Sequence, residues 1–167
     1  VQFLWQASER FSALLNLHGW ELDGTARVFR ANILKPGSND LASGFSQDKV
    51  YQDGLNDQEI SAQGGAFTLN YEFDFATLTA ITGYETLDMF SRGDIDGGFG
   101  AVFAPPFGPG FIPFPSESGD GIPELDQFTQ EIRLASDTGG AWDWLVGFFY
   151  FDESLKAESF SYDSLAG

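Results

Sequence analysis

The amino-acid sequence predicts an all-β fold, an antiparallel up-and-down meander of about six strands. Three observations support this prediction. Apolar and polar residues alternate with a period of two wherever the sequence is regular. Short turns and long acidic connections follow one another along the chain. The longest apolar run, residues 144–151, falls far short of the ~20 residues that a membrane-spanning helix requires.

The composition excludes several classes of protein. The 167 residues include 8 basic and 25 acidic side chains, which gives a formal net charge of −17. Nucleic-acid binding needs clustered Lys and Arg, so no nucleic-acid partner is expected. The same shortage argues against docking onto anionic lipid headgroups. The chain has no Cys, which excludes disulfides, thiolate metal sites and a cysteine nucleophile.

A first hairpin is predicted at about residues 1–34. In its first strand, Phe3 and Trp5 alternate with Gln2 and Gln6, and a short polar turn follows at residues 8–10. In the second strand, apolar residues at alternate positions lie opposite polar ones: Phe11, Ala13, Leu15 and Leu17 against Ser12, Asn16 and His18. This alternation is typical of strands with one apolar and one polar face.

Two further hairpins are predicted at about residues 64–92 and 126–162. The first of them alternates over residues 67–74, turns near residues 72–75 and continues into a segment rich in Thr and aromatic residues, as strands are. The last alternates over residues 127–134 and turns at residues 137–140. It then enters residues 142–151, which are largely apolar on both faces.

The connections between hairpins, at about residues 36–63 and 93–125, are of a different kind. Residues 36–63 carry five acids and one Lys, and residues 88–126 carry seven acids, one Arg and six of the seven prolines. Every second connection of a meander lies at the same end, and outer-membrane barrels have short periplasmic turns and long extracellular loops. The pattern therefore predicts a section of a transmembrane β-barrel with long extracellular loops. Because the chain opens on Val1 without a signal peptide, we expect a fragment of a longer protein.

Two stretches resemble the barrel wall of TonB-dependent outer-membrane receptors of the sphingomonad-like proteobacterial type. One is FATLTAITGY (75–84) with its continuation ETLDMFSRGDIDGG (85–98). The other is FTQEIRLAS (128–136), followed after a Gly-containing turn by WDWLVGFFYF (142–151). The resemblance covers about residues 64–153, and residues 1–34 only as a generic hairpin. No plug domain or TonB-contacting segment is recognisable in the sequence.

The resemblance implies a large plugged barrel, of a class with about 22 strands, in the outer membrane of a Gram-negative bacterium. Such receptors take up a scarce nutrient, siderophore-bound iron or similar, with energy from the TonB complex. The implied partners are a small-molecule or metal-chelate substrate at the extracellular face, outer-membrane lipid, and the TonB complex through the missing plug domain. About six strands cannot close such a barrel, so the chain alone is expected to be one section of wall that does not transport by itself.

The second long loop supplies the candidates for substrate contact. Its segment 99–115 is rich in Phe, Pro and Gly, and aromatic side chains packed on prolines form concave apolar surfaces of the kind that bind ligands. The alternative is that these Phe residues pack against one another as the loop folds. The candidate residues are Asp94, Asp96, Phe99, Phe103, Phe107, Phe111 and Phe114.

The segment that begins Asp94-Ile95-Asp96 resembles the start of a calcium-binding loop, in which alternate carboxylates converge on the ion. A full loop also needs a ligand near its fifth position and a Glu at its twelfth, which here are Gly98 and Pro105. We therefore expect a solvated acidic loop, with no metal site and no cofactor.

No catalytic site is predicted, and the chain is not expected to be an enzyme. His18 is the only histidine and cannot form a histidine metal cluster, so we expect a polar residue facing the barrel lumen or the interface. No Ser lies in a nucleophile-elbow pattern, and no phosphate-binding glycine loop follows a strand. Glu131 and Arg133 share one face of a strand and are expected to form a charge pair on the lumen wall.

Two other readings of the pattern stay open. A soluble acidic β-sandwich that binds glycan or calcium would explain the Asp-Gly loops, but it needs a second sheet to cover residues 142–151. A passive porin-like channel in the outer membrane would share the strand pattern without a plug or energy coupling.

Overall fold

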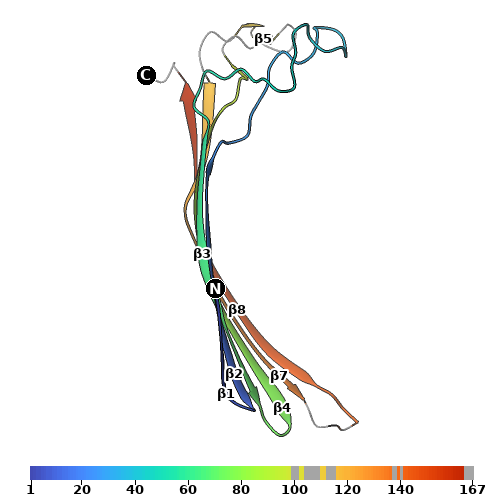
Figure 1. Cartoon of the computed structure of the whole chain (residues 1–167), viewed down its shortest axis with the longest axis vertical. Helices are drawn as coiled ribbons and strands as arrows, with labels where there is room; N and C mark the ends of the chain where they lie inside the picture. The colour runs from blue at the N-terminus through green and yellow to red at the C-terminus, as the bar shows by residue number, and fades with distance from the viewer. Residues whose placement is uncertain (99–101, 104–109, 112–115, 137–138, 140, 164–167) are drawn as a thin grey trace. The chain divides into compact units, whose positions relative to one another are not determined.

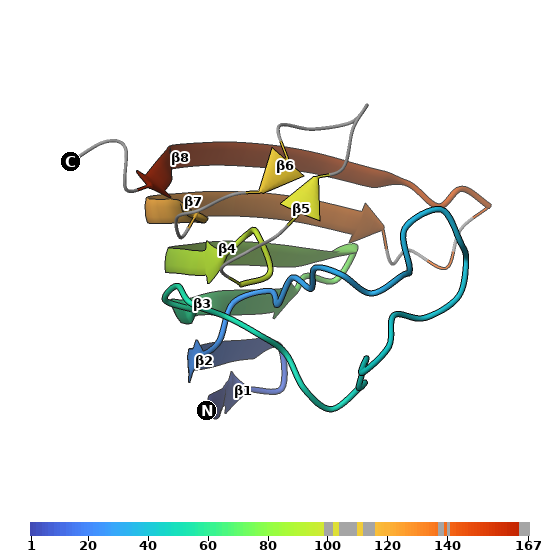
Figure 2. The same ribbon diagram turned by 90° about the horizontal axis from the view of Figure 1, so that it is seen from above.

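The computed structural model describes residues 1–98, 102–103, 110–111, 116–136, 139 and 141–163. Six strands form one antiparallel sheet in the order β1-β2-β3-β4-β7-β8 (Figure 1, Figure 2). They are β1 (Gln2–Ser8), β2 (Phe11–Gly24), β3 (Asp57–Glu72), β4 (Ala76–Asp94), β7 (Ser116–Ser136) and β8 (Leu145–Asp163). Two short strands, β5 (Val102–Phe103) and β6 (Gly110–Phe111), pair separately. The described residues contain no helix that could cross a membrane. The predicted all-β meander of six strands is confirmed.

The chain folds into two compact units. The first contains Val1–Glu21, Ser61–Asp88 and Ile122–Lys156, and the second contains Leu22–Ile60, Met89–Gly121 and Ala157–Gly167. The short turns therefore belong to the first unit, and both long connections belong to the second. Strands β1 and β8 are the two edges of the six-stranded sheet, which is open.

Backbone hydrogen bonds fix the short turns of the first unit. Strands β1 and β2 pair in antiparallel register, with Trp5 opposite Ala13. At the β3–β4 turn, the N–H of Phe73 donates to the carbonyl oxygen of Ala76 at 2.8 Å. The neighbouring N–H of Glu72 donates to Arg10 at 2.9 Å, which ties this turn to the β1–β2 turn. The short turns predicted at residues 8–10 and 72–75 are confirmed.

The two faces of the first unit differ in chemistry. One, the aromatic face, carries a row of ring contacts at the short-turn end, with centroids 4.7–6.5 Å apart: Trp5–Phe11, Phe11–Tyr71, Tyr71–Phe73 and Phe73–Phe75. The other, the polar face, carries the contact between His18 and Glu85 at 2.9 Å and the hydrogen bond from Thr79 to Asn70 at 2.9 Å. The alternation in the sequence therefore places apolar side chains on one face of the sheet and polar side chains on the other, as expected for pleated strands.

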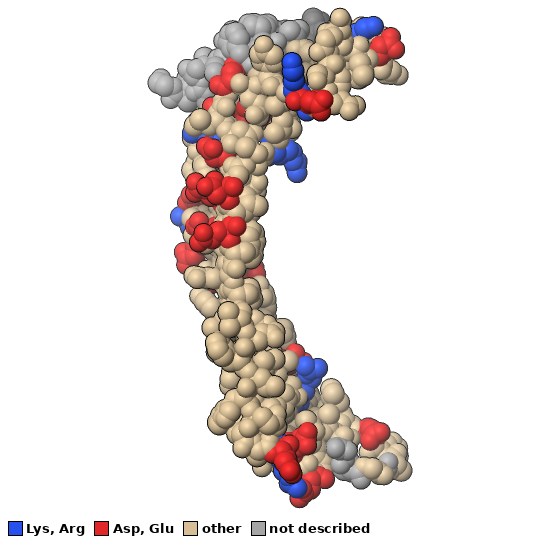
Figure 3. Space-filling view, in the orientation of Figure 1, with Lys and Arg blue, Asp and Glu red and all other residues tan. Residues whose placement is uncertain are grey.

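The sheet encloses almost no apolar core. Within the described residues, the buried hydrophobic side chains are Ala13, Ala26 and Ala76. Large side chains of the aromatic face stay exposed, among them Trp5 at 63% and Phe148 at 60%. In Figure 3, the strand surface next to the charged side chains at the short turns is uncharged in this view. A single sheet of this kind has to find its apolar contacts outside itself.

In the second unit, aromatic and charged side chains link neighbouring strands. Phe90 of β4 packs on Phe160 of β8, with ring centroids 6.2 Å apart. The guanidinium of Arg92 lies 3.8 Å above the ring of Tyr162 and forms an ion pair with Glu117 of β7. These contacts join β4 to β7 and β8 where the strands approach the long connections.

Several predicted boundaries were wrong. Strand β3 begins at Asp57 and β7 begins at Ser116, so both extend into the stretches expected as loops (36–63 and 93–125). Strand β2 ends at Gly24, and the first long connection starts there rather than at residue 36. The polar and acidic composition of residues 57–63 and the acids and glycines of residues 116–125 suggest loops, but pairing with neighbouring strands overrides this weak local preference. Of the turn expected at residues 137–140, only Gly139 lies within the described residues.

A substitution at Gly65 would test how tightly β2 and β3 pack. A Cβ atom at this position would lie 2.8 Å from the backbone carbonyl oxygen of Asn16 and 2.8 Å from Leu17 Cδ2. The strand cannot relieve the first contact by a rotamer change, so Gly65→Ala is expected to lower the free energy of unfolding by ~1–3 kcal/mol. The urea midpoint, followed by far-UV circular dichroism, measures the change.

The matched control is Gly24→Ala, where the nearest atom, Leu22 Cδ2, would lie at an ordinary 3.8 Å. That variant is expected to stay within ~0.5 kcal/mol of the parent. Equal midpoints for the two variants would contradict the close packing of β3 against β2.

Candidate functional site

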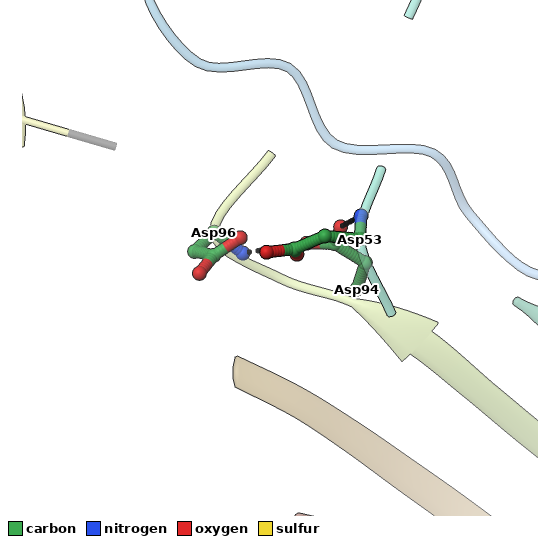
Figure 4. Close-up of side chains that lie close together, drawn as sticks. All are labelled: Asp53, Asp94 and Asp96. Atoms are coloured by element: carbon green, nitrogen blue, oxygen red, sulfur yellow. Dashed lines mark hydrogen bonds between the residues drawn. The ribbon is translucent and has the colours of Figure 1, made fainter. Parts of the chain in front are cut away.

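Three carboxylates from two distant segments meet in the second unit. Asp94 is the last residue of β4, Asp96 follows two residues later, and Asp53 comes from the first long connection. One carboxylate oxygen of each lies within 4.8 Å of those of the other two. We call these three residues the carboxylate cluster; Figure 4 shows their side chains gathered at the tip of β4.

Asp94 organises the cluster through backbone donors. Its side chain is fully buried (0% exposed). Its Oδ2 accepts the N–H of Asp53 at 3.0 Å, and its Oδ1 accepts the N–H groups of Asp96 at 3.1 Å and Gly97 at 3.0 Å. The chain can turn this sharply because Gly97 and Gly98 adopt positive φ values of 74° and 103°, which L side chains rarely adopt.

Asp96 is buried but only half satisfied. It is 7% exposed, and its Oδ1 accepts the N–H of Gly98 at 3.0 Å. Its Oδ2 has no hydrogen-bond partner. A carboxylate oxygen without a partner is costly to bury, because it loses its hydration without replacement.

Because three acids lie close together, their pKa values shift in different directions. Burial, followed by the adjoining Asp94 carboxylate, raises the pKa of Asp96 to about 6. Partial desolvation and the charge of Asp94 also raise the pKa of Asp53. Burial alone would raise the pKa of Asp94, but hydrogen bonds from Asp96 and from backbone N–H groups lower it overall. Asp94 is thus the carboxylate that keeps its charge, and Asp96 is the one that most readily holds a proton.

Further polar groups lie close to Asp53, in space or in sequence. Glu117 adds to the charge that raises the pKa of Asp53, although its own carboxylate is paired with Arg92. The side-chain amide nitrogen of Gln52 and both polar side-chain atoms of Asn56 are buried without a hydrogen-bond partner. The segment that supplies Asp53 therefore carries other groups able to bind a ligand.

The second unit also contains a cavity of about 680 Å³. Its lining is mixed and holds one basic and one acidic side chain, Arg27 and Asp120. Asp120 is held in place by the hydroxyl of Ser159, which donates to it at 2.9 Å. The cavity is large enough for a small molecule and offers it opposite charges, but it contains no arrangement of nucleophile and base.

The structure brings some of the predicted site residues together and not others. Asp94 and Asp96 do come together, but the expectation of a solvated acidic loop was wrong, because both are buried. Their burial leaves little surface for direct contact with a substrate. Phe103 and Phe111 lie in the β5–β6 pair, where Phe103 is opposite Gly110 and Phe111 opposite Val102. Phe99, Phe107 and Phe114 lie outside the described residues.

Sequence reasoning missed Asp53. It is one of several acids in a long loop, and its contact with Asp94 spans 41 residues of chain. No local motif distinguishes it from the other acids of that loop. The fold alone brings it to the cluster.

Two charge contacts of the first unit agree with expectation. Glu131 and Arg133 lie 2.9 Å apart, as their positions on one strand face predicted. His18 lies 2.9 Å from Glu85, as suits a polar residue on the polar face. Both contacts are largely exposed to solvent in this chain, so neither contributes much to stability.

Comparison of the chain with protein-family models, with curated proteins and with solved structures finds no match. Its function is therefore inferred from its residues and their geometry.

The raised pKa of Asp96 predicts a pH dependence of stability. Its ordinary value is 3.8 and its folded value is about 6, so the folded protein binds this proton more tightly than the unfolded chain does. By linkage, the Asp96 contribution to stability is complete below pH ~4 and is lost as the pH rises through ~6. In metal-free buffer, Asp96→Asn is expected to remove this decline, measured as the thermal unfolding midpoint at a series of pH values.

The control is Asp48→Asn, which changes an exposed aspartate in the same long connection. It should decline between pH ~4 and ~6 as the parent does. If Asp96→Asn declined equally, the tight proton binding at Asp96 would be disproved.

Proposed function

We propose that this chain is a section of the barrel wall of a TonB-dependent outer-membrane receptor for energised uptake of a scarce nutrient, such as siderophore-bound iron. The observation that carries the proposal is the uncovered aromatic face of a single sheet that has almost no core. Membrane lipid on that face would supply the missing apolar contacts.

The energetic argument is direct. Moving one large apolar side chain out of water is worth ~1.5–3 kcal/mol. The aromatic face exposes many such side chains, including Phe3 at 59%, Trp5 at 63% and Phe148 at 60%. Leaving all of them in water would remove most of the driving force for folding, since a typical domain is stable by only ~5–15 kcal/mol.

The position of the aromatic side chains also supports a membrane. The row that runs from Trp5 through Phe11 and Tyr71 to Phe73 lies beside the short turns. Outer-membrane barrels carry girdles of aromatic side chains at the membrane interfaces and have their short turns on the periplasmic side. Away from the turns, the hydroxyl of Thr82 donates a hydrogen bond to Oε1 of Gln130 at 2.7 Å, so these two polar side chains of the strands satisfy each other.

The edges of the sheet support a section of a larger wall. In β8, both faces carry exposed large apolar side chains: Phe148 at 60% on one face and Phe149 at 61% on the other. Unpaired edge strands with exposed apolar side chains tend to pair with a further strand. Lipid would cover one face of β8, and further protein, such as the plug of a receptor, would cover the other.

The transport part of the proposal rests on the polar face, the cavity and the resemblance of residues 75–98 and 128–151 to receptor walls. A β-sandwich would need a second sheet of comparable size, and β5 and β6 have two residues each. A passive channel would share the strand pattern but would need no energy source.

Cysteine labelling tests the membrane assignment cleanly, because the chain has no native Cys. Gln2 and Phe3 are adjacent, exposed and on opposite faces of β1. In intact membranes, a water-soluble maleimide is expected to label Gln2→Cys at least ~10-fold faster than Phe3→Cys, because lipid shields the aromatic face. After denaturation in urea, both should react equally.

Equal labelling of both positions in native membranes would overturn the lipid-facing assignment, as would recovery of the parent protein in the soluble cytoplasmic fraction. Energy coupling is tested separately. Deleting the parent gene should impair growth on ferric siderophore as sole iron source only in cells that retain TonB. Impairment that is independent of TonB would favour the passive channel.

A further inference from the structure

We propose that the carboxylate cluster, Asp53, Asp94 and Asp96, binds a calcium ion that joins the two long connections of the second unit. Asp53 belongs to the connection between β2 and β3, whereas Asp94 ends β4 and Asp96 lies in the connection that follows it. An ion held by all three would link segments that are 41 residues apart in sequence.

The unpaired oxygen of Asp96 is the observation that points to a ligand. The side chain is more than nine-tenths buried (7% exposed), its Oδ2 has no hydrogen-bond partner, and the carboxylate belongs to a group whose oxygens converge within 4.8 Å. Buried polar atoms in folded proteins are almost always satisfied. A bound cation would satisfy Oδ2 where no protein donor does.

The charge of the cluster also lacks a partner. The ion pairs among the described residues are Arg10–Asp74, His18–Glu85, Arg92–Glu117 and Arg133–Glu131, and none includes a member of the cluster. Glu117, another acid near Asp53, is already paired with Arg92. Carboxylates buried together are stable when they are paired, protonated or bound to a metal. Backbone N–H groups already donate to Asp94 and to Oδ1 of Asp96, and a divalent cation would offset the charge that remains.

The donor set selects a hard cation. All three side chains offer carboxylate oxygens, and the chain contains no Cys, so the thiolate ligands that favour zinc are missing. Asn56 adds a buried Oδ1 without a partner, and its Nδ2 lies 3.9 Å from where a Cβ on Gly93, the residue before Asp94, would be. Calcium accepts six to eight such oxygens, including amide and backbone carbonyls.

Calcium suits this cluster better than magnesium. Magnesium demands near-ideal octahedral geometry and usually keeps several waters, so it seldom binds in a site built only from protein oxygens. Calcium accepts irregular arrangements and bidentate carboxylates. The cluster is assembled from two loops, and Asp53 is exposed whereas its two partners are buried, which favours the ion with the more flexible coordination.

Isothermal titration of the chelator-treated protein with calcium chloride at pH 7 tests the proposal. We expect one saturable site with a dissociation constant no weaker than the ~10⁻³ M limit of extracellular calcium modules. Asp53→Asn and Asp96→Asn should each weaken binding by at least ~10-fold, because each removes a charged ligand. Asp48→Asn, a charge-matched change in the same connection, should bind as the parent does.

Asp53→Asn separates loss of a ligand from loss of folding. Asp53 supports Asp94 through its backbone N–H, which the substitution keeps, and its side chain is exposed. The variant should therefore keep the parent's thermal midpoint in chelator and lose only the rise in midpoint that calcium causes in the parent.

Three outcomes would overturn the proposal: no saturable calcium binding up to the ~10⁻³ M range, unchanged affinity in Asp53→Asn and Asp96→Asn, or tighter binding of magnesium than of calcium. The inference does not depend on the proposed receptor function, since the titration measures a local site whichever compartment the parent protein occupies.

Discussion

The constraint on which the rest of this structure depends is that its one large sheet finds no second layer to pack against among the described residues. Alternation gives each strand an apolar and a polar side, and six such strands in one layer produce an aromatic face that stays open. Side chains such as Trp5 and Phe148 are therefore placed for contacts that the described residues do not supply. Soluble β proteins solve this with a second layer, and membrane barrels solve it with lipid.

In the second unit, polar interactions hold described segments of the long connections in place. Asp94 accepts backbone N–H groups from the turn that follows it and from Asp53, and Arg92 joins Glu117 and Tyr162 across neighbouring strands. The price of this solution is a buried acid, Asp96, with one oxygen unsatisfied. That oxygen makes the cluster a place where a cation or a proton changes the stability of both connections together.

Sequence reasoning succeeded where structure depends on local periodicity. The turn at residues 8–10 and the separation of Phe11 and Leu15 from His18 follow from side-chain alternation, which holds in any paired strand. It failed where pairing overrides composition, as in residues 116–125, whose Gly and Pro content suggests a loop although β7 continues through them. The candidate site shows the same limit. The spacing of Asp94 and Asp96 marks the first two carboxylates, but Asp53 joins them only through the fold, and no local pattern indicates which loop acid will do so.

The acidity of the chain therefore has two physical meanings. Most of its 25 acidic side chains can stay hydrated on loops and strand ends, where a net charge of −17 mainly favours solubility and attracts cations to the loops. Asp94 and Asp96 differ, because burial removes the water that would otherwise stabilise their charge. A general excess of acid does not call for a specific partner, whereas a buried pair beside Asp53 would be stabilised by one. The surrounding acidic loops would raise the local concentration of cations, and the cluster would select the one that fits its oxygens. Net charge and site geometry thus act in sequence, the first by attraction over distance and the second by coordination at contact.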